Sequence, residues 1–413
     1  MSISIGGVNL KQQFLFGRQT WTYMLMRIFF SAMSIILSLF INTFLLKAFG
    51  NFSFELISYQ VTLRTAQPFA VFCALLISSR FGSVIAQASG LCMYLISLGM
   101  LCLFGDGVRY LYPVFALLLG FADAFFFCVN CMQFLSFTAD ENRDRFSSIL
   151  SLIVSIISIF LPTVCGYLIQ HFPNFTGYQL VFGFAAAFTV VCLILSTRLS
   201  VPQQKRSLPQ IGHTLKRILS NKNCLRCIIA NALLSCKGNV LGLFVTMLVY
   251  NLISNEAVIG LRSSLDSIAG LIGTAVYGIV VRSSNRTKSS VIAQILVLIP
   301  CLWMLFRLDM IVLMVFSVVL AFTNTFLSTP ITFTYYKSVE SLELHGDSGA
   351  VVQLAHDIFV ALAGVPGFLL IALIPKSNSW AVALIVAMTL LSVVATFLVR
   401  IADKDLKANE SCR

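Results

Sequence analysis

The feature that most constrains the fold is a series of long apolar segments that runs through nearly the whole chain. A run of about 18 apolar residues is long enough to cross the hydrocarbon core of a bilayer as a helix. Lipid offers the backbone no hydrogen-bond partner, so each such segment has to be helical. We therefore predict an all-α integral membrane protein with twelve transmembrane helices. They are expected at about residues 23–49, 54–79, 83–104, 110–137, 146–172, 178–197, 228–253, 257–281, 290–306, 310–336, 348–374 and 380–401.

The composition agrees with a membrane protein. About a quarter of the residues of soluble proteins are charged, whereas here 58% are hydrophobic and only 11% are charged. The mean hydropathy is +0.91. The first apolar segment is longer than the apolar core of a secretory signal peptide, so we expect it to be retained as a helix.

A basic linker divides the chain into two halves of similar length. Residues 198–226 hold seven Lys and Arg, no Asp or Glu, and two prolines. We expect one bundle of six helices over residues 1–197 and a second over residues 227–413. The halves echo one another. Asp144 and Asp347 are 203 residues apart, and each stands at the start of the fifth helix of its half. Such a repeat indicates two pseudo-symmetric six-helix bundles.

The linker contains a pattern of its own. Ile211, Leu215, Ile218 and Leu219 fall at helical spacing, with basic residues on the opposite face. This pattern predicts a short amphipathic helix that lies in the membrane interface. We expect it to couple the two halves mechanically.

The distribution of charge indicates the orientation in the membrane. Of the 28 Lys and Arg, 20 fall in loops and tails on one side of the predicted membrane and four on the other. The positive-inside rule then puts both termini and the linker in the cytoplasm. We expect a multi-pass protein of the plasma membrane whose lipid partners include anionic headgroups. Nucleic acid is not an expected partner, although the net charge is +12.

Motifs of enzymes are missing from the sequence. It contains no His-Glu-x-x-His metal motif, phosphate-binding loop, nucleophile elbow or dinucleotide fingerprint. Two Cys-x-x-Cys pairs, Cys128/Cys131 and Cys224/Cys227, have no supporting His nearby, and Cys in apolar segments behaves as a small hydrophobe. We therefore expect no enzymatic activity, no catalytic residue, no bound metal and no cofactor.

Several motifs resemble those of one transporter family. The loop after the second helix keeps Arg80 and Gly82 of the pattern Gly-x-x-x-Asp-Arg-x-Gly-Arg-Arg, with Ser79 at the acidic position. Pro162 and Gly166 partly echo a proline–glycine pattern in the fifth helix of drug/proton antiporters. With twelve helices in two halves and a basic linker, the chain resembles the major facilitator superfamily over nearly its whole length, with degraded signature loops. The resemblance implies a monomer in which two bundles surround a central cavity.

Charges inside a membrane are the best candidates for functional groups. Each costs at least about 2.5 kcal/mol at the bilayer centre, so it needs a partner or a wet cavity. Apart from charges within three residues of a helix end, seven fall within the predicted helices, namely Arg27, Arg64, Asp123, Lys237, Arg262, Asp266 and Asp357.

Asp123 lies near the middle of the fourth predicted helix. Phe127 and Asn130 follow it at near-helical spacing, and Arg64 and Gln67 form a similar polar stripe in the second helix. The resemblance implies that these side chains face the cavity, where Asp123 is a candidate proton carrier. Alternatively, Asp123 and Arg64 form a buried ion pair that locks two helices together.

The second half offers further candidates. Lys237 and Asn324 are candidate contacts of the substrate, although Lys237 could instead pair with Asp266 or Asp357. Arg262 and Asp266 are four residues apart, which allows an ion pair on one helix face.

The roles of two other charges stay open. Asp357 is a candidate either for proton coupling or for a gating ion pair, and Arg80 belongs with the gating or structural pairs.

The resemblance implies a secondary transporter that works by alternating access and is energised by a proton gradient. Three adjacent aromatic residues beside Asp123, Phe125 to Phe127, favour proton-coupled export of a small amphipathic molecule. Proton-linked uptake of a polar or anionic solute is the alternative, with Lys237 and Arg64 binding its negative group. A third hypothesis is a sensor or lipid-handling protein that keeps the fold without transporting anything.

Overall fold

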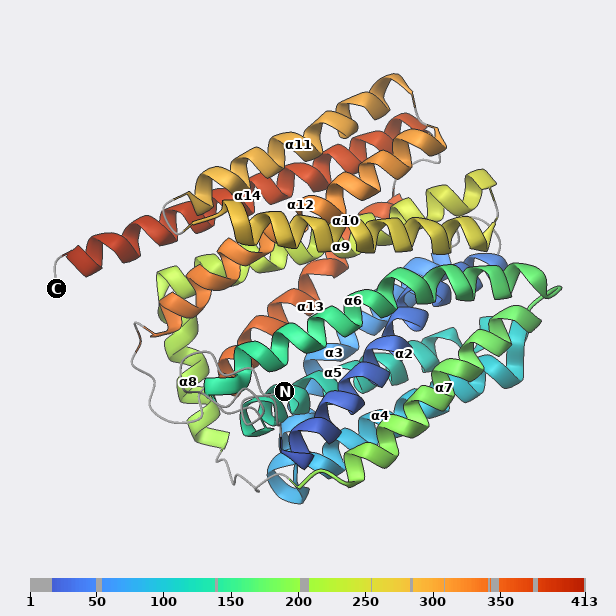
Figure 1. Ribbon diagram of the computed structural model, residues 1–413, viewed down its shortest axis with the longest axis horizontal. Helices are drawn as coiled ribbons and strands as arrows, with labels where there is room; N and C mark the ends of the chain where they lie inside the picture. Colours follow the sequence, from blue (N-terminus) through green and yellow to red (C-terminus); the bar gives the residue numbers. More distant parts are fainter. Residues whose placement is uncertain are drawn as a thin grey trace, which may run out of the picture.

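The computed structural model describes residues 17–49, 54–137, 140–200, 208–253, 255–282, 285–307, 309–340, 342, 349–373 and 378–411. Within these ranges the chain forms thirteen α-helices and one short 3₁₀ helix, and no strand. Figure 1 shows the helices in two groups, with the blue to green first half on one side and the yellow to red second half on the other.

Six helices form each bundle. The first bundle consists of α2 (Arg18–Phe49), α3 (Phe54–Phe81), α4 (Ser83–Phe104), α5 (Tyr112–Phe137), α6 (Asp140–His171) and α7 (Thr176–Thr197), with the 3₁₀ helix η1 (Gly105–Tyr110) between α4 and α5. The second consists of α9 (Lys222–Ile253), α10 (Glu256–Val280), α11 (Arg286–Phe306), α12 (Met310–Glu340), α13 (Gly349–Leu373) and α14 (Asn378–Ser411). Between the two sets in the sequence comes α8 (Leu208–Ser220).

The helices have the length and composition that a membrane requires. Eleven of the described helices contain a segment long and apolar enough to cross a bilayer, and α13 contains the shorter apolar stretch Ile358–Leu373. Each of the twelve predicted segments corresponds to one of the twelve bundle helices. The predicted fold class, an all-α membrane protein with two six-helix bundles, is confirmed.

Some helix ends differ from the prediction because polar residues also form helix. The start of α9 at Lys222 lies inside the predicted linker, because Asn221 Oδ1 accepts hydrogen bonds of 3.0 Å from the backbone N–H groups of Asn223 and Cys224. A cap of this kind satisfies donors that the first turn leaves free. At the other end of the chain, α14 continues to Ser411, about ten residues beyond the expected end.

The amphipathic helix of the linker exists as α8, but protein covers its apolar face. Ile218 is fully buried in a cluster with Cys224 and Cys227 of α9, Tyr335 of α12 and Ala402 of α14. The sequence predicted that this face would lie against the membrane interface. Part of the covering surface, Tyr335 and Ala402, is far away in the sequence. The spacing of the apolar residues alone therefore could not distinguish protein from lipid.

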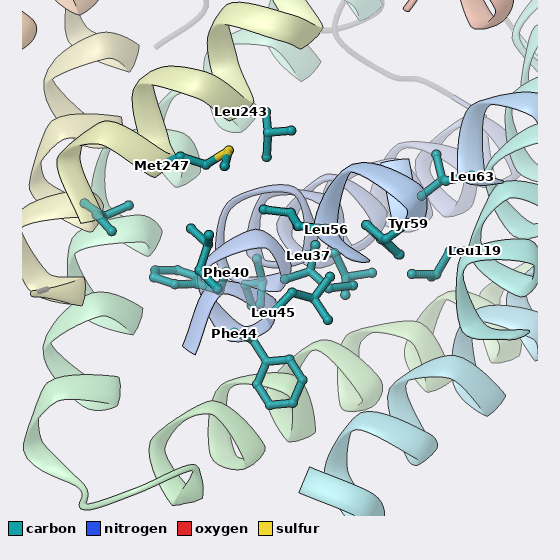
Figure 2. Packing of buried hydrophobic residues seen from close by; sticks show 14 of the residues in the cluster. Leu37, Phe40, Phe44, Leu45, Leu56, Tyr59, Leu63, Leu119, Leu243 and Met247 are labelled. Carbon is teal, nitrogen blue, oxygen red and sulfur yellow. The ribbon is translucent and has the colours of Figure 1, made fainter. Parts of the chain in front are cut away.

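The apolar core continues from one bundle into the other. Figure 2 shows Leu243 and Met247 of α9 across from Leu37 and Phe40 of α2 and Leu56 of α3. These side chains belong to one continuous cluster of buried residues. The bundles therefore share an apolar contact surface.

Two glycines bring α6 and α10 close together along the same boundary. A Cβ atom on Gly166 would lie 2.7 Å from the carbonyl oxygen of Glu256, and one on Gly260 would collide with the carbonyl oxygen of Pro162. Only a residue without a side chain permits this approach of the two backbones. Nearby, the hydroxyl groups of Thr163 and Ser264 are 2.7 Å apart and link the bundles by a hydrogen bond.

A charged contact also joins the bundles, at the end opposite the linker. Lys47 Nζ at the end of α2 lies 3.5 Å from Glu256 Oε1 at the start of α10. The Tyr178 hydroxyl of α7 donates a hydrogen bond of 3.1 Å to the same oxygen. Glu256 therefore receives two groups of the first bundle, and we call these three residues the far-end contact.

Candidate functional site

A cavity of about 430 Å³ lies between the two bundles. We call it the central cavity. Arg64 and Asp123 line it from the first bundle, and Arg262 and Asp266 from the second. Its other polar residues carry hydroxyl or amide groups, namely Ser34, Ser38, Asn42, Tyr59, Gln60, Tyr94, Ser158, Asn239, Thr246, Ser263 and Ser267.

Asp123 is held by hydrogen bonds from two other helices of the first bundle. The Tyr94 hydroxyl of α4 donates to Asp123 Oδ1. The Gln67 amide of α3 donates to Asp123 Oδ2 at 3.3 Å. Both carboxylate oxygens therefore have a donor.

Arg64 does not form an ion pair with Asp123. Its Nη1 donates to Gln67 Oε1 at 3.3 Å, so that Gln67 stands between the guanidinium and the carboxylate. Its Nη2 donates to Asn239 Oδ1 of α9 at 3.0 Å, which crosses to the second bundle. No described group accepts a hydrogen bond from Arg64 Nε.

The second bundle holds its arginine and carboxylate in direct contact. Arg262 Nε lies 3.5 Å from Asp266 Oδ2, one turn further along α10. Ser317 of α12 accepts from Arg262 Nε at 2.9 Å and donates to Asp266 Oδ2 at 2.6 Å. Arg262 Nη1 also donates to Thr246 Oγ1 at 3.3 Å. Asp266 Oδ1 has no hydrogen-bond donor among the described residues.

Lys237 and Asn324 line a neighbouring space. This side cavity, of about 410 Å³, lies within the second bundle and shares Arg262 and Asp266 with the central cavity. Lys237 is only 2% exposed, and its ammonium donates to Ser392 of α14 at 3.1 Å. Ser392 in turn donates to Gln294 Oε1 at 2.8 Å. Among the described carboxylates, none lies within ion-pair distance of Lys237.

Other predicted site residues lie outside both cavities. Asn130 Oδ1 accepts a hydrogen bond of 2.7 Å from the Tyr23 hydroxyl. Phe127 packs edge-on against Phe30, with ring centroids 5.8 Å apart. Arg80 is exposed at the end of α3 and pairs with no described carboxylate.

The other two aromatic residues of the triplet also pack against neighbouring side chains. Phe126 stacks on Phe30 with ring centroids 3.3 Å apart, and Phe125 is buried with residues of α3. The aromatic triplet therefore does not form a wall of the central cavity.

Asp357 falls in α13, and its side chain lies outside the described residues. Arg27 is half-buried, with its guanidinium 5.9 Å from the centre of the Phe126 ring. No described group accepts a hydrogen bond from its Nη1. Among the described residues, no three His, Cys, Asp or Glu side chains gather where they could hold a metal ion.

Comparison with known proteins decides the family. The family model described as Major Facilitator Superfamily matches residues 22–364. The chain belongs to the major facilitator superfamily. Uncharacterized protein YqgE of Bacillus subtilis (strain 168) is 19% identical over 297 residues, which is 72% of this chain and 69% of that protein.

Solved transporters share the fold of this major facilitator protein. A point mutant of the nucleoside transporter NupG has a TM-score of 0.68 at 13% identity, over 93% of this chain and all of the other. A D-xylose–proton symporter has a TM-score of 0.69 at 13% identity, over 92% of this chain and 96% of the other. At this identity the likeness concerns the fold. Family and fold together make the chain a multi-pass secondary transporter and not an enzyme.

The structure of this superfamily member reveals polar partners that the sequence analysis missed. Tyr94 was overlooked because it is a single hydroxyl in an apolar segment. Ser317 and Thr246 were overlooked because serine and threonine are common in membrane helices. Lys47 and Glu256 could have been noticed, because they are opposite charges at the outer ends of two predicted helices. Nothing in the sequence showed, however, that those helices are neighbours.

Proposed function

We propose that this transporter carries a small polar solute with a negatively charged group, together with a proton and in the same direction. The observation that carries the proposal is Arg64, a cation that lines the central cavity and has no described carboxylate in ion-pair contact. A buried guanidinium needs an anion or several acceptors to offset its desolvation. The two neutral amides do not balance the positive charge of Arg64, and an anionic group of the solute would supply the missing negative charge.

The position of Asp123 supports the coupling to a proton. Gln67 connects Asp123 to Arg64, so a change of charge on the carboxylate alters the field at the guanidinium. When Asp123 takes up a proton, Arg64 loses the nearest negative charge and attracts an anion more strongly. Proton and anion therefore favour each other's binding, which is the requirement for moving both in one direction. An inward proton gradient would then drive uptake.

The contacts between the bundles support alternating access. The far-end contact and the close approach of α6 and α10 hold the bundles together on one side of the cavity. Rocking of one bundle against the other about the central cavity would have to break the contacts to Glu256. From the charge asymmetry of the sequence, we propose that the linker end faces the cytoplasm at the plasma membrane and that the monomer is the working unit.

A transport assay with purified protein tests the proposal. Proteoliposomes enclosing a pH-sensitive dye receive either lactate, gluconate or glutamate, or the lipophilic cation tetraphenylphosphonium, on the outside. Acidification of the lumen by one of the anions, absent in protein-free vesicles, is expected. Asp123→Asn should abolish this proton movement while the protein remains folded and still binds the anion. Alkalinisation by the lipophilic cation alone would overturn the proposal.

Proton-coupled export of a small amphipathic molecule remains the second candidate. Part of the central cavity is apolar, with Leu63, Leu119, Leu243 and Phe368 in its walls. A lipophilic cation would compete with the proton for Asp123, and such competition leads to exchange in opposite directions. The assay above separates the two candidates by the sign of the pH change. Binding of solutes without any proton or solute movement would instead favour a sensor or a lipid-handling protein.

A further inference from the structure

We infer that the transported solute is a zwitterion, whose negative group binds Arg64 in the first bundle and whose N–H cation binds Asp266 in the second. The inference rests on the proposed function, and it adds the second charged group of the solute. Its basis is a contrast among the described charged residues that line the central cavity. Arg64 Nε and Asp266 Oδ1 are buried without a described hydrogen-bond partner, whereas Arg262 and Asp123 have no such atom.

Of the two arginines, Arg64 is the one without a carboxylate among its described partners. Arg262 already contacts a carboxylate, Asp266, and also bonds to Ser317 and Thr246. Arg64 bonds only to neutral amide oxygens, and its Nε has no described acceptor. A guanidinium has five N–H donors and pairs best with a carboxylate or phosphate in a forked geometry. The negative group of the solute is therefore assigned to Arg64.

Of the two carboxylates, only Asp266 has capacity left for a cation. Asp123 receives a donor on each oxygen, from Tyr94 and from Gln67. Asp266 receives both of its contacts on Oδ2, from Ser317 and Arg262, while its Oδ1 has no described donor. A carboxylate oxygen accepts hydrogen bonds and suits an N–H donor with a positive charge. A quaternary ammonium, which has no N–H, would not satisfy it.

The two free groups belong to opposite walls of one cavity. Arg64 stands on α3 and Asp266 on α10, and both line the central cavity between the bundles. Both free atoms are covered in the present arrangement, so small rotations of the two side chains have to accompany binding. A solute with one charge could engage only one bundle, whereas a zwitterion connects the two.

The volume of the cavity limits the size of this solute. A cavity of about 430 Å³ lies in the lower part of the range of about 300 to 1,000 Å³ that small-molecule pockets span. A small zwitterion would fit, and the Ser, Asn and Gln side chains of the wall would bind its remaining polar groups.

Matched ligands test the inference on the wild-type protein. For each of four amino acids, alanine, leucine, glutamine and phenylalanine, we would compare four ligands with the same carbon skeleton. These are the free amino acid, its N-acetyl derivative, its methyl ester and its N-trimethyl derivative. Binding is measured by calorimetry on the purified protein. For at least one skeleton, the amino acid should bind about ten- to hundredfold more tightly than each of the other three.

The result separates this inference from the proposed function. If the N-acetyl derivative binds as tightly as the amino acid, the anion site stands and the zwitterion is excluded. If the methyl ester binds best, both proposals are wrong, and if no compound binds to the folded protein, the inference is also wrong. Asp266→Asn should lower the affinity for the amino acid to that for its N-acetyl derivative. Asp405→Asn, at a carboxylate that pairs with Arg226 outside both cavities, is the matched control and should preserve the difference. Should Asp266→Asn not fold, the four ligands on the wild type still decide.

Discussion

The two bundles present an arginine and a carboxylate to the same cavity in different ways. In the second bundle, Arg262 and Asp266 stand on one helix and lie 3.5 Å apart. In the first bundle, Arg64 and Asp123 stand on different helices and communicate through the amide of Gln67. The second pair stays intact wherever its helix moves, whereas the first pair depends on the relative position of α3 and α5.

This difference suggests a division of labour between the bundles. A direct ion pair neutralises its own charges and contributes to a fixed structure. A pair mediated by an amide leaves each charge partly uncompensated, so a proton or an anion can change its balance. We therefore expect the first bundle to respond to protons and the second to be the more rigid of the two.

The largest effect should follow from breaking the direct pair. Arg262→Met leaves Asp266 as an uncompensated buried charge, and removing one partner of a buried pair costs about 3 to 5 kcal/mol. The free energy of unfolding, measured by SDS titration in mixed micelles, should fall by that amount. The double variant Arg262→Met/Asp266→Asn should recover most of the loss, because no lone charge remains. Equal stability of the single variant and the wild type would show that the ion pair does not contribute to the free energy of unfolding.

The corresponding change in the first bundle should cost less. Arg64→Met removes the hydrogen bonds to Gln67 and Asn239, but Asp123 keeps both of its donors. We expect a loss of about 1 to 3 kcal/mol in the free energy of unfolding, measured in the same titration. Anion binding should be lost at the same time. A destabilisation as large as that of Arg262→Met would contradict the difference between the two pairs.

Much of this fold follows from the sequence, because a bilayer leaves the backbone little choice. The twelve apolar segments predicted the bundle helices, and Arg64 and Asp123 were expected to face the cavity that they line. Arg262 and Asp266 were expected as an ion pair on one helix face, and they line the same cavity. The cost of an unpaired charge in lipid makes such residues conspicuous. Lys237 was equally conspicuous, but the structure places it in the side cavity.

What the sequence left open depends on which helices are neighbours. The pair of Arg262 with Asp266 follows helical spacing, so one helix suffices to predict it. The chain of contacts from Arg64 through Gln67 to Asp123 and Tyr94 needs three helices at fixed relative positions. The aromatic triplet beside Asp123 favoured an amphipathic substrate in the sequence analysis, but it does not line the cavity. Phe126 and Phe127 pack against Phe30 of another helix, a contact that the sequence could not show.

A third prediction concerns the amide that mediates the first pair. Gln67→Leu keeps a similar volume but disconnects Arg64 from Asp123, so the proton and the solute should no longer favour each other's binding. The number of protons moved per solute in proteoliposomes should fall, with a loss of only about 1 kcal/mol in the free energy of unfolding. Gln294→Leu, which removes a buried amide bonded to Ser392 of the second bundle, is the control and should leave the proton ratio unchanged. An unchanged ratio in Gln67→Leu would remove the mediating role of this amide.

The smallest predicted effects compare one hydroxyl donor from each bundle. Interhelical hydrogen bonds in membranes contribute about 0.6 kcal/mol on average and up to about 1.7 kcal/mol. Ser317→Ala should cost near the average, because Arg262 Nε remains within 3.5 Å of the same oxygen of Asp266. Tyr94→Phe should cost near the upper value, because no other described group donates to Asp123 Oδ1.

The difference between these two variants is measurable even where each effect is small. Each variant removes one hydroxyl group that donates a hydrogen bond to a carboxylate of the same cavity. Errors that come from the unfolded state as reference therefore largely cancel in the comparison. We expect Tyr94→Phe to be the less stable variant by about 1 kcal/mol in the SDS titration. Equal losses would mean that Asp123 finds a replacement donor as easily as Asp266 does. In that case the two carboxylates would be equally well supported, and the distinction between a fixed and a responsive bundle would have to rest on Gln67 alone.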